Sequence, residues 1–215
     1  MNRPTAAVRY AILGVGVVYT ALLYLAGFQF TGLSKHLIAL LPAAGTVALT
    51  LWDGWLWRIA PLNKLVHRPR IDGLWQLTIT PTSESHIPPG GNRGPILAFM
   101  TVSQSYWSIH VRLCTVESVS LSRSFFWEHP NGADTERLVF VYENEPRHIH
   151  QHRSVRHIGS CVLDIVGKQP DNFMGTYFTD RYTKGDMEFE LIDRTKDYAS
   201  FASAQKYVET LRNGR

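Results

Sequence analysis

The chain has 215 residues, of which 45% are hydrophobic, and a formal net charge of +4. So mild a basic excess does not by itself indicate a nucleic-acid partner, and we expect no DNA binding. The sequence contains no glycine-rich phosphate loop, HExxH, GxSxG or paired CxxC motif, so no catalytic residues, metal site or cofactor are expected. Cys114 and Cys161 lie in strand-like runs and are predicted to be reduced core residues.

Two uncharged apolar runs dominate the N-terminal sixty residues. The first begins at Tyr10 and ends at Phe28, which as a helix is ~28 Å, about the thickness of a bilayer's hydrocarbon core. The second begins at Leu37 and reaches membrane length if it continues to Trp57. We interpret residues 1–60 as a transmembrane helical hairpin followed by a linker. A cleaved signal peptide and a buried helix pair in a soluble protein are the alternatives.

The basic residues predict the orientation of this hairpin. Arg3 and Arg9 precede the first run, Lys35 is the basic residue between the runs, and Arg58 begins a basic segment after the second. Because cytoplasmic flanks carry the excess of lysine and arginine, both termini are predicted to be cytoplasmic. Asp53 is predicted either to lie at the membrane interface or to form a polar contact between helices.

After a linker over residues 61–70, the sequence changes to short runs that alternate apolar and polar side chains. Trp75, Leu77 and Ile79, for example, share one face of the first run. About eight such runs with hairpin-length connections predict a small antiparallel, up-and-down β-barrel over residues 71–215. A two-layer sandwich is the alternative. Apolar residues at helical spacing after Ser200 predict a short C-terminal helix.

The fourth predicted strand contains an arginine on its apolar face. Val119, Leu121, Phe125 and Trp127 alternate with serines, and the same parity places Arg123 inside the barrel. A buried cation without a partner is costly. Arg123 is therefore expected either in a structural ion pair or on a ligand phosphate.

The other candidate ligand-binding residues are Tyr177, Arg181, Trp75 and Trp107. Tyr177 and Arg181 share one parity in "GTYFTDRYTKG", where a tyrosine can stack on a base and an arginine can bind a phosphate. The alternative is a core tyrosine and an arginine that caps a hairpin. Trp75 and Trp107 begin the apolar faces of two strands and belong either to the core or to a pocket wall.

A run of alternating histidines offers a possible metal site. His148, His150 and His152 would face one metal ion if the run were a strand. The run lies beside Pro146 in a predicted loop, however, so we interpret it as a solvated basic loop.

The order of these segments resembles a known family. Two N-terminal apolar helices, a proline-broken linker, "IDGLW" at the start of a strand-rich domain and "GTYFTDRYTKGDMEFEL" near its end are similar to the two-transmembrane, β-strand-rich effectors of CBASS antiphage systems. These effectors accompany CD-NTase enzymes. The resemblance implies a cytoplasmic barrel that binds a cyclic dinucleotide made by the partner enzyme. It also implies a bacterial inner-membrane location, contact with membrane lipids, homo-oligomerisation on activation and membrane disruption that causes abortive infection.

Two other functions remain open from the residues alone. The same barrel and its aromatic side chains would suit a membrane-tethered, lipocalin-like lipid-binding protein. The histidine run would be the main support for a metal-dependent enzyme.

Overall fold

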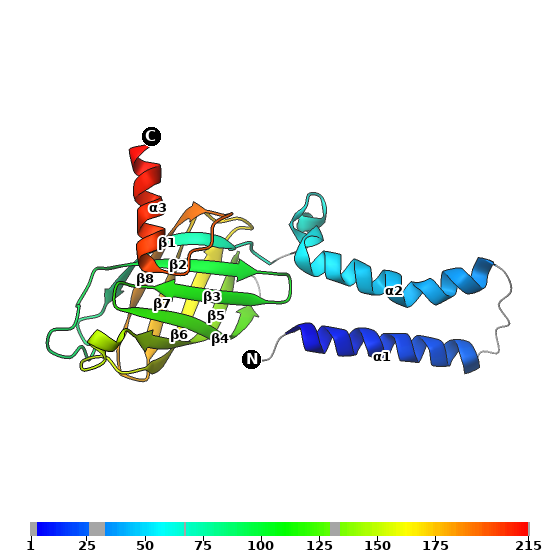
Figure 1. Cartoon of the computed structure of the whole chain (residues 1–215), viewed down its shortest axis with the longest axis horizontal. Helices are drawn as coiled ribbons and strands as arrows, with labels where there is room; N and C mark the ends of the chain where they lie inside the picture. Colours follow the sequence, from blue (N-terminus) through cyan, green and yellow to red (C-terminus); the bar gives the residue numbers. More distant parts are fainter. Residues whose placement is uncertain (1–3, 26–32, 67, 130–133, 215) are drawn as a thin grey trace. The chain divides into compact units, whose positions relative to one another are not determined.

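The computed structural model describes residues 4–25, 33–66, 68–129 and 134–214. The chain divides into two compact units (Figure 1). The first comprises Met1–Val66 together with Ser105–Ser108, and the second comprises His67–Gln104 together with Ile109–Arg215.

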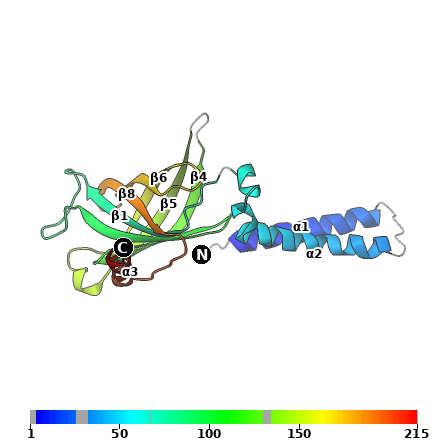
Figure 2. The same cartoon turned by 90° about the horizontal axis from the view of Figure 1, so that it is seen from above.

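Two helices form most of the first unit. Helix α1 spans Pro4–Leu25 and helix α2 spans Leu33–Gly54, and the two lie side by side (Figure 2). Short 3-10 turns follow at Leu56–Arg58 and Leu62–Leu65. Both predicted helices are therefore present, and each starts earlier than its apolar run.

The ends of the predicted membrane spans differ from the helix ends. Phe28 lies outside the described residues, and Trp57 lies in a 3-10 turn beyond the end of α2. Among the described residues, no helix is both long and apolar enough to meet the criterion for a membrane span. The two predicted transmembrane helices are thus not confirmed.

Asp53 and Trp107 meet within the first unit. The Asp53 carboxylate accepts a hydrogen bond from the Trp107 backbone N–H at 3.0 Å, and its carbonyl accepts one from the Tyr106 N–H at 3.0 Å. The Tyr106 ring lies edge-on to Trp52 and Trp57, with centroids 5.6 and 6.0 Å apart. Asp53 therefore orders a turn, a role that neither reading of the sequence anticipated.

The second unit is a closed barrel of eight strands, as predicted. Each strand is antiparallel to the next, and β8 closes the barrel by pairing with β1, so the sandwich alternative is wrong. The strands are β1 Gly73–Pro81, β2 Ile96–Gln104, β3 Ile109–Cys114, β4 Ser118–Glu128, β5 Thr135–Pro146, β6 His157–Val166, β7 Asn172–Thr179 and β8 Lys184–Asp193.

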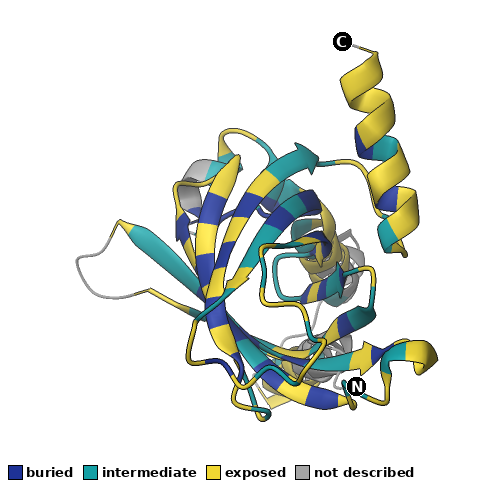
Figure 3. Cartoon of the chain, turned by 90° about the vertical axis from the view of Figure 1, so that its left-hand side faces the viewer, coloured by how far each residue is buried: buried dark blue, intermediate teal, exposed yellow. Residues whose placement is uncertain are grey.

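Buried and more exposed residues alternate along strands such as β6 (Figure 3), as expected where successive side chains face the interior and the exterior of the barrel. One part of the interior is densely packed. The ring centroids of Trp75 and Phe173 lie 4.5 Å apart, as do those of Phe173 and Phe189. Trp75 is fully buried, and its indole N–H donates to the Ile71 carbonyl at 2.9 Å. Burial of this much apolar surface is the main stabilising contribution to the barrel.

The predicted C-terminal helix is α3, Phe201–Asn213. Ser200 is its N-cap, as expected, and its hydroxyl accepts from the Ser203 N–H at 3.2 Å. Two buried residues of the helix, Ala204 and Val208, join Leu74 and Phe99 in a small cluster. This cluster uses the outward face of β1 and β2 and lies apart from the barrel core.

The predicted parity of β4 is wrong in its first half. Ser120 is buried and Leu121 is exposed, whereas Phe125 packs against the core. A register shift between Ser122 and Ser124 changes which residues face inward. Arg123, at this shift, has a side chain that is 61% exposed and pairs with Glu143 on β5.

Candidate ligand-binding cavity

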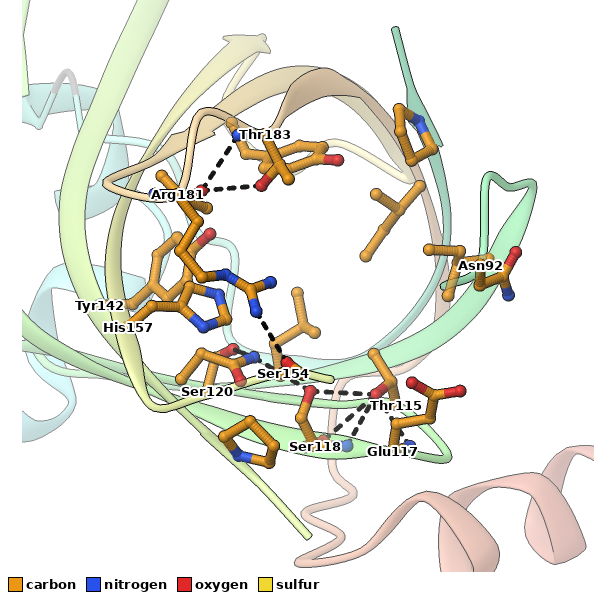
Figure 4. A pocket seen from close by; sticks show the side chains of 18 of the residues that line it. Asn92, Thr115, Glu117, Ser118, Ser120, Tyr142, Ser154, His157, Arg181 and Thr183 are labelled. Atoms are coloured by element: carbon orange, nitrogen blue, oxygen red, sulfur yellow. Dashed lines mark hydrogen bonds between the residues drawn. The ribbon is translucent and has the colours of Figure 1, made fainter. Parts of the chain in front are cut away.

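A cavity of about 480 Å³ occupies one end of the barrel (Figure 4). Its wall includes residues from four connections, namely β1–β2, β3–β4, β5–β6 and β7–β8. Apolar side chains such as Ile79, Val111 and Met187 form part of the wall, and polar side chains form the remainder. A cavity of this size and mixed character is typical of small-molecule sites, which measure roughly 300–1,000 Å³.

A row of serines on β4 forms one polar wall. The Asn144 amide nitrogen on β5 donates to the hydroxyls of Ser118 at 3.0 Å and Ser120 at 2.9 Å. The Ser122 hydroxyl accepts from the Val111 N–H at 2.9 Å. The Asn144 amide oxygen is buried and has no hydrogen-bond partner among the described residues. It is therefore an acceptor that a ligand N–H or O–H could use.

Two tyrosines in the cavity wall each lie over a glycine of the neighbouring strand. Tyr142 pairs with Gly159, where an added Cβ would come within 2.4 Å of the phenol ring. Tyr177 pairs with Gly185, where a Cβ would come within 2.8 Å of its ring. Burial raises the pKa of both phenols, that of Tyr177 to about 12, so both are neutral and able to donate a hydrogen bond.

The β7–β8 turn directs Arg181 toward the cavity. Tyr182 adopts a left-handed φ of 61°, and the hydroxyls of Thr179 and Thr183 lie 2.7 Å apart across the turn. One guanidinium nitrogen of Arg181 donates to the Ser154 hydroxyl at 2.9 Å, as Figure 4 shows.

The electrostatic environment of Arg181 favours an anion. Its Nε is buried without a hydrogen-bond partner, and no carboxylate in the described part of the chain forms an ion pair with it. Desolvation lowers the pKa of the guanidinium from its ordinary value, while Asp180 acts in the opposite direction. Because a half-buried guanidinium with a buried, unpaired N–H is unfavourable, a phosphate at this position would satisfy it.

His157 presents a hydrogen-bond acceptor to the same cavity. Its Nδ1 lies 2.9 Å from the Val155 carbonyl. A carbonyl only accepts, so Nδ1 carries the proton and Nε2 is left with a lone pair. Burial lowers the pKa of His157, which favours this neutral form. Figure 4 places His157 beside Arg181 and Tyr142.

Arg153 connects the loops around the cavity. Its guanidinium donates to the Gly90 carbonyl in the β1–β2 loop at 2.8 Å and to Glu117 in the β3–β4 turn at 2.7 Å. The next residue, Ser154, accepts from Arg181 in the β7–β8 turn. The β5–β6 connection thus joins the other three connections at this end of the barrel.

Two of the five predicted ligand-binding residues, Tyr177 and Arg181, come together in the cavity wall. Arg123 points outward, and Trp75 packs in the core at a distance from the cavity lining. Trp107 belongs to the first unit. For Arg123 the structure agrees with the predicted alternative of an ion pair, and for Trp75 with the predicted alternative of a core residue. The contact of all five residues with a ligand stays a prediction.

Several cavity residues were missed by the sequence reasoning. Tyr142 and Asn144 continue the inward parity of β5, so that signal was available in the sequence. The alternating serines of β4 were also visible, but they were assigned to the outer face. His157 and Arg153 lie beside a loop whose course the sequence did not indicate.

The histidine run forms no visible metal site. His148–His150 is a short 3-10 turn, consistent with the predicted loop. Within the described residues, no group of three metal-ligating side chains is found.

An eight-stranded barrel with one packed end and a cavity of mixed polarity at the other is an architecture that can hold one small ligand. A family model, Cap15, cyclic dinucleotide receptor domain, matches residues 66–191, which is more than half of the chain. The chain belongs to this family, the cyclic dinucleotide receptor domain of CBASS effectors, as the resemblance implied. Such a domain is a receptor, which agrees with the expectation of a non-enzyme. Comparison with curated proteins gives no match.

Proposed function

We propose that the chain is a CBASS effector whose barrel binds a cyclic dinucleotide in the cavity described above. Ligand binding then drives oligomerisation of the N-terminal helices and disruption of the inner membrane. The single observation that best supports the ligand site is the half-buried side chain of Arg181, which lines the cavity and has a buried, unpartnered Nε.

The cavity wall matches the chemistry of a cyclic dinucleotide group by group. Such a ligand carries two phosphates and two bases. Arg181 suits a phosphate, because a guanidinium can form paired hydrogen bonds with its oxygens. The rings of Tyr142 and Tyr177 can stack on a base. The Asn144 amide oxygen and His157 Nε2 can accept hydrogen bonds from base N–H groups.

The membrane part of the proposal is supported by composition. The apolar runs of α1 and α2 and the basic residues that flank them suit a hairpin with both termini in the cytoplasm. A ligand can activate such a hairpin only if it binds the assembled state more tightly than the resting state. The messenger would come from a CD-NTase enzyme.

Calorimetry on the full chain in detergent tests the ligand site. A panel of cyclic dinucleotides with purine and pyrimidine bases should include at least one member that binds with a measurable heat. Arg181→Ala should abolish or strongly weaken this heat, whereas the matched variant Arg123→Ala, on the barrel exterior, should retain it. Absence of heat with every member, or equal loss in both variants, would contradict the proposal.

Two further measurements test the remaining parts. Addition of the binding nucleotide should release a dye from vesicles that contain the full chain, and vesicles without ligand should stay intact. The apolar part of the cavity wall also suits an acyl chain, so mass spectrometry should be applied to the purified protein. A stoichiometric co-purified lipid in the barrel would favour the lipid-binding alternative.

A further inference from the structure

Two neighbouring side chains of the cavity wall each present a hydrogen-bond acceptor. Asn144 on β5 lies directly opposite His157 on β6 in the sheet register, and both line the cavity. On its other side Asn144 lies opposite Ser120 of β4, so the three residues form a row across adjacent strands. Directly opposed residues of an antiparallel pair have their Cβ atoms about 4.5–5.5 Å apart. The asparagine and the histidine are therefore immediate neighbours on one wall.

The amide of Asn144 is held in one orientation by β4. Its nitrogen donates to the hydroxyls of Ser118 at 3.0 Å and Ser120 at 2.9 Å. With the nitrogen used in this way, the amide oxygen points elsewhere, and in the described part of the chain that oxygen is buried without a hydrogen-bond partner. An unpaired buried acceptor is costly, so a ligand group that donates to it recovers this cost.

The imidazole of His157 is held in an equivalent way. Its Nδ1 lies 2.9 Å from the Val155 carbonyl, which can only accept, so the ring proton is on Nδ1 and Nε2 is an acceptor. The residue is 8% exposed. Arg181 lies beside the ring in Figure 4, but its guanidinium donates to the Ser154 hydroxyl instead. Among the described residues, no donor is bonded to Nε2, which leaves it for a ligand.

Two adjacent acceptors require two N–H hydrogens from one ligand edge. The exocyclic amino group of a base is planar, and with hydrogen bonds of about 2.9 Å its two hydrogens span acceptors roughly 5 Å apart. Neighbouring side chains at the spacing of this pair can place their acceptors at that span. Uracil and hypoxanthine carry a carbonyl oxygen where cytosine and adenine carry the amino group. Such a keto base offers one ring N–H, which satisfies one acceptor and leaves the other facing an oxygen.

We infer that Asn144 and His157 are specificity-determining residues that select a base with an exocyclic amino group and reject a keto base without one. The inference rests on the proposed function and names the class of base that this wall reads. The position of the pair fits a nucleotide, because His157 lies beside Arg181, whose guanidinium suits the phosphate attached to the same nucleoside (Figure 4). Discrimination of this kind is strong, since the wrong base leaves a buried polar group unpaired.

Calorimetry on the full chain in detergent tests the selection with matched ligands. Cyclic di-AMP and cyclic di-GMP are each compared with cyclic di-IMP, and cyclic di-CMP is compared with cyclic di-UMP. The tightest ligand should be one with an amino group, and its Kd should be at least about tenfold lower than that of its keto counterpart. Equal affinity within every pair, or tighter binding of the keto member, would overturn the inference.

Variants of Asn144 show whether this residue carries the preference. Asn144→Leu removes the acceptor at similar size and should bring the ratio of the two Kd values close to one, because a keto base can satisfy the single acceptor that remains. Asn144→Asp keeps an oxygen acceptor and should keep the preference. The matched control is Asn172→Leu, at an exposed position of β7 outside the cavity lining, which should leave the ratio unchanged.

The ratio of Kd values separates selection from a merely structural role. A variant that only loosens the barrel weakens both ligands of a pair and leaves their ratio unchanged, so a full preference in Asn144→Leu would overturn the role of Asn144. A chain that binds cyclic dinucleotides equally within each pair loses the selection and remains a receptor. A chain that binds no member of the panel contradicts the proposed function, and the selection fails with it.

Discussion

The two ends of the barrel interior are built from the same strands but have opposite character. On β1, Trp75 and Leu77 belong to the packed end, whereas Ile79 lines the cavity. On β6, Leu163 is fully buried in the core, whereas His157 faces the cavity. Along β1 and β6, inward-facing and outward-facing residues alternate at both ends of the barrel. What differs between the two ends is the size and polarity of the inward-facing side chains.

This difference shows what alternation does and does not determine. A period of two establishes which side chains point inward. Whether the interior is filled or hollow depends on the summed volume and polarity of inward side chains from all eight strands. At the packed end these are aromatic rings and branched aliphatic side chains, and at the other end they include serines and an asparagine.

The largest effect should come from the packed end. Trp75→Ala removes a fully buried ring that packs on Phe173 and is expected to lower the free energy of unfolding by about 3–5 kcal/mol. Chemical denaturation of the full chain measures this loss. Trp75→Phe, which keeps an aromatic ring, should lose clearly less. A loss below about 1 kcal/mol for the alanine variant would contradict dense packing at this end.

At the cavity end, loss of Arg181 should affect binding far more than stability. A hydrogen bond to a charged group contributes about 1.5–3 kcal/mol, so Arg181→Ala should raise the Kd for the cyclic dinucleotide roughly ten- to a hundredfold. The unfolding midpoint should change little, because within the described residues the Arg181 side chain hydrogen-bonds to one other side chain, the Ser154 hydroxyl. Isothermal titration measures the affinity. Arg181→Lys should recover only part of it, since an ammonium cannot form the same paired contacts.

Gly159 provides a way to fill the space beneath Tyr142. Gly159→Ala places a Cβ within 2.4 Å of the phenol ring, so the ring must move, at a cost of about 1–3 kcal/mol in stability. Ligand affinity should fall as well, because Tyr142 forms part of the cavity wall. Combining the change with Tyr142→Leu should restore stability only in part, because the added Cβ also lies 2.9 Å from the Phe178 carbonyl oxygen, and it should not restore affinity. Unchanged thermal unfolding in the single variant would contradict the close approach.

The buried histidine should make stability depend on pH in one direction. Burial lowers the pKa of His157 in the folded chain below its ordinary value near 6.5. Below that value the unfolded chain binds a proton more readily than the folded chain. The stabilising contribution is therefore complete above pH 6.5 and is lost as the pH falls through the folded pKa. His157→Gln should flatten this part of the stability profile measured by denaturation at pH 5 to 8.

The smallest effect should come from the barrel exterior. Arg123→Ala removes an exposed side chain from Glu143, which keeps its second partner, Arg156. Exposed ion pairs contribute little, so both stability and ligand affinity should stay near their original values. A large loss of affinity, measured by the titration used for Arg181→Ala, would return Arg123 to the ligand site.

The fold was largely predictable because strand alternation and turn spacing are local signals. The eight runs, the hairpin connections and the C-terminal helix after Ser200 all follow from nearby residues. The parity of β4 was not predictable in the same way. The shift between Ser122 and Ser124 depends on pairing with β5 and on the Val111 bond, which join β4 to its two neighbouring strands and do not follow from the sequence of β4 itself.

The site was predictable only in part, for the same reason. Tyr177 and Arg181 share one strand and its turn, so a single stretch indicated them. The other polar groups come from β4, β5 and the β5–β6 connection and meet only in three dimensions. Trp75 and Trp107 illustrate the limit of such local signals. Each begins the apolar face of a predicted strand, but the sequence of that strand does not show whether neighbouring strands leave a pocket beside the ring or fill the space.

The aromatic composition of the cavity has a practical consequence for optical work. The described cavity wall holds tyrosine and phenylalanine but no tryptophan, whereas Trp75 and Trp127 lie among the packed core side chains. Intrinsic indole emission therefore comes from the packed core and from the four tryptophans of the first unit, and none of it comes from the described cavity wall. A tryptophan introduced at Phe140, where the packed and hollow regions meet, would give a separate fluorescent reporter of occupancy within the same molecule.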